Sequence, residues 1–67
     1  MQIGDPVRVY PVGRPEQAGE AVVIAVAKSG DSIAVTLLPV EMHIYAHREH
    51  PQAPWIDLET GQALEIN

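Results

Sequence analysis

The stretch GEAVVIAVAK (Gly19–Lys28), followed by SG (Ser29–Gly30) and DSIAVTLL (Asp31–Leu38), decides the fold. Two runs rich in β-branched residues on either side of a glycine-containing connection predict a long β-hairpin. Gly30 supplies a residue that tolerates a positive φ, as a tight turn requires. The connection is either the pair Ser-Gly or a longer loop from Lys28 to Asp31 built on a type I turn, and both give the same strand pairing.

The register of this hairpin follows from its side chains. A slip of one residue would set bulky residues opposite Ser or Ala and turn one apolar face outward, so register is well specified where a face is buried. The favoured register gives each bulky residue a bulky partner, and pairs Val26 with Ile33, Ile24 with Val35, Val22 with Leu37, and Lys28 with Asp31. These bulky residues are therefore expected to line the inner face of a barrel.

The opposite face of the predicted hairpin is also apolar. A sheet that faces water on one side normally carries polar residues there, whereas here the outward positions hold mostly small apolar side chains. A contiguous apolar patch on a folded chain is typical of an interface. We therefore expect a homo-oligomer whose interface contains Ala21, Val23, Ala25, Ala34 and Thr36, with Ala25 and Ala34 near a two-fold axis.

Composition narrows the function classes. A chain of 67 residues makes one small domain of marginal stability, and without cysteine it has neither a disulfide nor a thiolate metal site. Nine acids against four basic residues give a formal charge of −5, which disfavours binding to nucleic acid through its phosphates. No leader segment or apolar run long enough to span a bilayer is present, so we expect a cytoplasmic protein with no membrane partner.

The rest of the chain reads as further short strands. Val7 and Val9 alternate with polar residues in the first strand, and Pro11 ends it. Residues 41–46 form a strand or, alternatively, a helix, and residues 55–66 form a last hairpin in which Ile56 and Leu58 share a face with Leu64 and Ile66. The prediction is a single all-β domain over residues 1–67, a small barrel of about five antiparallel strands built on the central hairpin.

The opening of the chain resembles that of a known class of barrel. Gly4-Asp5-x-Val7-x-Val9, then a proline-rich loop, then Gly19-x-Ala21-Val22-Val23-Ile24 is similar to the start of the Src-homology-3 (SH3)-like barrels of small bacterial proteins. The resemblance covers about the first 40 residues and implies an SH3-like fold.

Plasmid-borne type II dihydrofolate reductases, members of this broad class, offer a narrower comparison. Their Val-Gln-Ile-Tyr strand lines a pore that binds folate and nicotinamide cofactor, and Met42-His43-Ile44-Tyr45 resembles that strand. The resemblance implies an oligomeric ligand-binding barrel that uses His43, Ile44 and Tyr45. However, the family's lysine after the first strand is missing here, and a net charge of −5 would repel both anionic ligands.

Three histidines form a candidate metal site. His43, His47 and His50 fall within eight residues, flanked by Glu41 and Glu49, and imidazole is the usual nitrogen ligand of Zn²⁺ or Ni²⁺. The alternative is that they are solvated side chains on a polar segment broken by proline, because the spacing matches no recognised metal motif.

Two aromatic residues are candidates for partner binding. Tyr45 and Trp55 could form an exposed patch of the kind that grips extended or proline-rich peptides. The alternative for Trp55 is that it fills the core of an otherwise aliphatic chain that contains no Phe.

The functional prediction combines these observations. No catalytic constellation or nucleotide motif is present, so we expect a non-enzymatic interaction or accessory module without a cofactor, which self-associates and binds a protein or peptide. The expected partner-binding residues are His43, Ile44, Tyr45 and Trp55. The alternatives are the reductase-like ligand-binding barrel and a histidine-based metal-binding protein.

Overall fold

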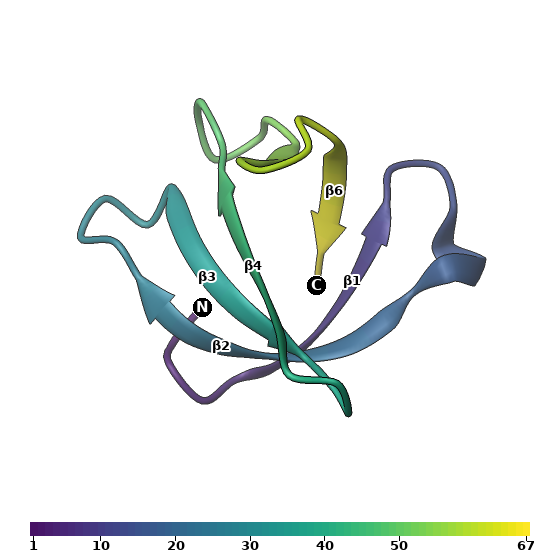
Figure 1. Ribbon diagram of the computed structural model, residues 1–67. Coiled ribbons are helices and arrows are strands. Elements are labelled where there is room, and N and C mark those ends of the chain that lie inside the picture. The colour runs from purple at the N-terminus through teal and green to yellow at the C-terminus, as the bar shows by residue number, and fades with distance from the viewer.

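The computed structural model describes all 67 residues as a closed antiparallel barrel, in which each strand pairs with the next and β6 pairs back to β1 (Figure 1). The strands are β1 (Pro6–Pro11), β2 (Gly19–Val26), β3 (Ser32–Leu37), β4 (Met42–His47), β5 (Trp55–Asp57) and β6 (Ala63–Ile66), and a short 3-10 turn η1 (Pro15–Gln17) follows β1. The prediction of an all-β small barrel is confirmed, with six strands rather than about five. Residues 42–47 form a strand and not a helix. The only helical segment is η1, and the structure has no helix that is long and apolar enough to cross a membrane.

The central hairpin is present and closes through the longer of the two expected loops. Ala27 donates its N–H to the Ser32 carbonyl at 2.8 Å, which leaves Lys28–Asp31 as the loop. Inside the loop, the Gly30 N–H donates to the Ala27 carbonyl at 2.9 Å, and Gly30 has a φ of 81°. The left-handed backbone at this position explains why the sequence has a glycine there.

The predicted register holds only near the turn. Val26 pairs with Ile33 as expected, but the register then shifts by one residue at a β-bulge between Val23 and Ala25. Beyond the bulge Val23 pairs with Val35 and Val22 with Thr36, so the expected pairings of Ile24 with Val35 and of Val22 with Leu37 are both wrong. An extra residue in one strand reverses which side chains of that strand face inward from that point on.

The core is aliphatic and contains a single large ring. Val23 and Val35 are fully buried at its centre, and Trp55 is 5% exposed. The buried cluster comprises Val7, Val9, Ala21, Val23, Ile33, Val35, Ala46, Trp55, Leu64 and Ile66, with Val26, Leu37 and Ile44 packed against it. A cluster drawn from all six strands is what stabilises a barrel that has no disulfide.

The last hairpin has a different inward face from the one expected. Trp55 pairs with Leu64 and Ile56 with Ala63, so it is Trp55 that shares the core face with Leu64 and Ile66. Leu58 lies beyond the end of β5 and is 65% exposed. The prediction that Ile56 and Leu58 share a face with Leu64 and Ile66 is therefore wrong, because a tryptophan fills the barrel interior better than the aliphatic residue after it.

Candidate functional site

A row of apolar side chains crosses the outside of the barrel over four successive segments. Ala25 on β2 pairs with Ala34 on β3, and Ala34 pairs with Tyr45 on β4. The row continues to Leu58, whose N–H donates to the Tyr45 carbonyl at 2.9 Å. We call this row together with the neighbouring Ala27 the outer patch.

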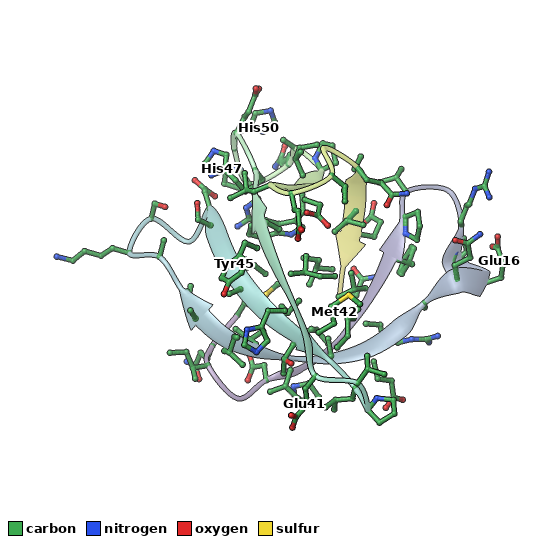
Figure 2. The ribbon with its side chains drawn as sticks, viewed as in Figure 1. Glu16, Glu41, Met42, Tyr45, His47 and His50 are labelled. Atoms are coloured by element: carbon green, nitrogen blue, oxygen red, sulfur yellow. The ribbon has the colours of Figure 1, made fainter.

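The outer patch is shaped as a shallow groove with an alanine floor. The groove has a volume of about 250 Å³, and the only lining side chain with a hydrogen-bonding group other than Tyr45 is Ser32. Ala34 is 5% exposed, whereas Tyr45 and Leu58 are 54% and 65% exposed and therefore stand above the floor. In Figure 2, Tyr45 projects from β4 on the side of β2 and β3. No charged side chain lines the groove, although the chain carries a net charge of −5.

The residues expected at the subunit interface divide between the two faces of the sheet. Ala25, Ala34 and Thr36 lie on the outer face, and Ala25 is exposed. Ala21 and Val23 are 2% and 0% exposed and belong to the core, so their placement at the interface is wrong. The bulge near Ile24 is the physical reason, because it turns the first half of β2 by one residue relative to the second half.

Next to the outer patch lie His43 and Thr36, which face each other across β3 and β4. The rings of His43 and Tyr45 meet edge to face with centroids 6.4 Å apart and an interplanar angle of 83°. The Oγ1 of Thr36 is buried without a hydrogen-bond partner. His43 therefore adds a polar ring to the surface beside Tyr45, whereas the Thr36 hydroxyl is buried.

The histidines of the candidate metal site do not converge. No group of three or more His, Cys, Asp or Glu side chains lies close enough together to hold a metal ion. The His47 Nδ1 shares a hydrogen bond of 2.7 Å with the Ser32 Oγ, and the His50 Nδ1 accepts one from the Gln52 N–H at 3.2 Å. His47 and His50 lie at the upper end of β4 and in the loop after it (Figure 2), whereas His43 is the second residue of the strand and pairs with Thr36.

Trp55 belongs to the core, and a cation covers its outer side. The guanidinium carbon of Arg48 lies 4.4 Å from the centroid of the Trp55 ring. The Arg48 Nε donates to the Asp31 Oδ1 at 2.9 Å, and another guanidinium nitrogen donates to the Gly30 carbonyl at 3.2 Å. Trp55 is thus separated from Tyr45, and the two rings do not form one aromatic patch.

The three residues of β4 that resemble a ligand-binding strand lie on two faces. Ile44 packs against the core, whereas His43 and Tyr45 are exposed on the outer face. Within a single chain, these three side chains cannot line one pocket, because successive residues of a strand point to opposite faces. Ile44 instead lines a separate cleft that also contains side chains of β1 and β6.

Sequence reasoning missed two residues that shape these surfaces. Leu58 was predicted to share a face with Leu64 and Ile66, although it is followed directly by a polar turn, which indicates the end of a strand. Arg48 was treated as a loop residue, yet it is the only basic residue after Lys28 other than the histidines. The available signal was that the only arginine in the second half of the chain, Arg48, comes shortly before the only tryptophan, Trp55. Arginine often stacks on aromatic rings.

Comparison with known protein families, curated proteins and solved structures finds no significant match to this chain. The resemblances to SH3-like barrels and to type II dihydrofolate reductases therefore stay predictions.

Proposed function

We propose that this protein is a non-enzymatic interaction module of the SH3-like barrel class that self-associates through the outer patch. The observation that carries the proposal is the row Ala25–Ala34–Tyr45–Leu58, an uncharged groove on the surface of an acidic chain. Apolar patches of this kind are typical of protein interfaces. The closed six-stranded antiparallel barrel is compatible with the SH3-like class.

The size of the barrel supports association. A chain of 67 residues without disulfides buries a small core, and such chains commonly gain stability from oligomerisation. An interface of standard size takes about 800 Å² from each partner, a large share of the 4483 Å² that the barrel exposes. The outer patch is uncharged, so the repulsion between two chains of charge −5 is lowest when these faces meet.

The shape of the outer patch suits a two-fold contact. A two-fold axis brings the same surface of both copies together, so each protruding residue needs a hollow on that same surface. Tyr45 and Leu58 protrude, and the alanine floor beside them is the hollow. In such a contact the Tyr45 ring of one copy covers Ala25 of the other, with Ala34 near the axis.

Light scattering on charge-substituted variants tests this proposal. Ala25→Glu and Leu58→Glu place a carboxylate on the outer patch, and both should reduce the measured mass to the 7.3 kDa of one chain. Val40→Glu is the matched control, because Val40 is 70% exposed and lies outside the patch. It should keep the oligomer mass of the parent.

Circular dichroism of each variant establishes that the barrel remains folded, which separates loss of association from loss of structure. A parent protein that is monomeric at high micromolar concentration would refute self-association. Val40→Glu dissociating as readily as Leu58→Glu would place the contact somewhere other than the outer patch.

A further inference from the structure

One edge of β4 is paired with a neighbouring strand over only part of its length. On one side, β4 pairs with β3 along its whole length, from Met42 to His47. On the other side, β5 has only three residues and pairs only with Ala46 and His47, after which the Leu58 N–H donates to the Tyr45 carbonyl. The first half of β4 therefore has no strand paired to it on the β5 side.

The backbone N–H and C=O of His43 point to this unpaired side of β4. In a sheet, the N–H and C=O groups of successive residues point alternately to the two neighbouring strands. The Arg48 N–H donates to the carbonyl of Asp31, the residue directly before β3, so the even-numbered residues of β4 bond to β3. The Tyr45 carbonyl accepts a bond from the β5 side, so the odd-numbered residues of β4 point to that side. His43 is two residues before Tyr45, so its N–H and C=O also point to the β5 side, where no strand is present. None of the hydrogen bonds outside the strand ladders involves His43.

A cleft with an apolar floor adjoins this free edge. The cleft has a volume of about 240 Å³, and its floor is formed by Val9, Leu37, Ile44 and Leu64. Its volume lies below the roughly 300–1,000 Å³ of small-molecule sites, which suits a side chain better than a cofactor. Gln17, Gln62 and Asp57 are polar groups at the same cleft.

The charges around the edge are negative. Glu41 precedes β4 and lies at its lower end in Figure 2, and Asp57 lines the cleft beyond it. No basic side chain lines the cleft, and the whole chain carries −5. An occupant with lysine or arginine next to its apolar residue therefore matches the charge of this surface.

We propose that the free edge of β4 binds an extended basic peptide segment by strand addition, with one apolar side chain of the peptide in the cleft. The peptide backbone pairs with the N–H and C=O of His43, as in other strand-addition complexes. This proposal names a partner class for the interaction module. It uses a surface distinct from the outer patch, so it does not require self-association.

The first experiment compares two peptides on the unmodified protein. The probe is the capped peptide Lys-Val-Lys-Ile-Lys-Val-Lys, and its control carries the same side chains with alternate backbone nitrogens methylated, which removes the donors along one edge. Titration followed by amide NMR and calorimetry should show binding of the first peptide and at least tenfold weaker binding of the second. The His43 amide should exchange rapidly in the free protein and slow at least tenfold in the complex.

A matched pair of variants locates the site. His43→Ala keeps the backbone N–H and should bind the probe as the parent does, whereas His43→Pro lacks this donor and should bind at least tenfold more weakly. Proline is tolerated where a strand N–H has no ladder partner, so His43→Pro should remain folded. Ala25→Glu, which disrupts the outer patch on β2, two strands away from β4, should bind the probe unchanged, so the failure of self-association and the failure of this proposal are distinguishable.

Four results would overturn the proposal. They are absence of binding at millimolar probe, equal binding of the methylated peptide, equal binding of a Glu-for-Lys peptide, and a His43 amide that is already protected in the free protein. Protection of that amide that rises with protein concentration would show that a second copy occupies the edge, which also overturns it.

Discussion

Arg48 makes contacts with two different parts of the barrel, and its replacement should be the most costly change of any exposed or half-exposed charge. Its guanidinium bonds to Asp31 and Gly30 in the β2–β3 loop, and it covers Trp55 at the start of β5. Arg48→Ala removes all of these contacts together. The loop of the central hairpin would then be joined to the rest of the barrel mainly through the strands.

The magnitude can be estimated contact by contact. The ion pair with Asp31 contributes about 0.5–1 kcal/mol, since both side chains keep about a quarter of their surface exposed, 24% and 25%. The cation over the Trp55 ring contributes about another 0.5–1 kcal/mol. The bond to the Gly30 carbonyl at 3.2 Å adds a few tenths, and the 3.4 Å contact with the Pro51 carbonyl is too long to count. Arg48→Ala should therefore cost about 2 kcal/mol of unfolding free energy.

Thermal unfolding at one fixed protein concentration measures this cost. A loss of about 2 kcal/mol lowers the Tm of a domain this small by about 8–16 °C. Far-ultraviolet circular dichroism follows the strands, and Trp55 fluorescence reports the same transition from inside the core. Arg48→Lys should lose about half as much unfolding free energy, because the lysine ammonium keeps the positive charge but lacks the planar set of N–H donors of the guanidinium. Arg14→Ala is the control, since the Arg14 side chain is exposed and makes no hydrogen bond.

A Tm for Arg48→Ala within about 2 °C of the parent would refute the reasoning, because a loss of about 2 kcal/mol of unfolding free energy lowers the Tm of so small a domain by much more than that. An Arg48→Lys variant as stable as the parent would show that charge alone accounts for the effect. A double-mutant cycle with Asp31→Ala then isolates the ion pair, which should couple by no more than about 1 kcal/mol.

Two further substitutions test the central hairpin. Gly30→Val should destabilise the protein by about 1–2 kcal/mol in urea denaturation, because Gly30 has a φ of 81° and a β-branched residue is strained there. No atom lies within 4 Å of the added Cβ, so Gly30→Asn should lose clearly less, and equal losses would mean that backbone strain is not the cause. Thr36→Val should stabilise by about 1 kcal/mol, because the Thr36 Oγ1 is buried without a partner and valine replaces that hydroxyl with a methyl group. A less stable Thr36→Val variant would show that the hydroxyl is hydrogen-bonded in solution.

The parts of the fold that the sequence predicted are those set by local chemistry. Gly30 and the alternation of Val7 and Val9 identify the central turn and the first strand directly, and both are present. The bulge was not predictable in this way, because Val22, Val23 and Ile24 are equally suited to face inward. Which of them enters the core depends on how the barrel closes, and that depends on strands distant in sequence.

The candidate site was only partly accessible to sequence reasoning for the same reason. Ala25 and Ala34 were predicted to face outward, and they do, because both lie where the predicted register of the hairpin holds. Tyr45 was a candidate for an exposed aromatic patch, and its side chain is exposed. Trp55 could not be assigned from parity alone, since a short last hairpin admits more than one register. Its burial is decided by the volume inside the barrel, which a chain without Phe has few other side chains to fill.

Both proposed surfaces arise from local departures from regular strands. The extra residue at the bulge lets Val23 and Val26 both face the core, although a regular strand would place them on opposite faces. Ala25 is consequently left outside opposite Ala34, and the small size of both residues creates the floor beside Tyr45. The shortness of β5 has two effects, since it leaves Leu58 outside the core at the rim of this floor and leaves the first half of β4 without a neighbour. A barrel with a regular β2 and a longer β5 would therefore have the same fold but neither the outer patch nor the free edge at His43.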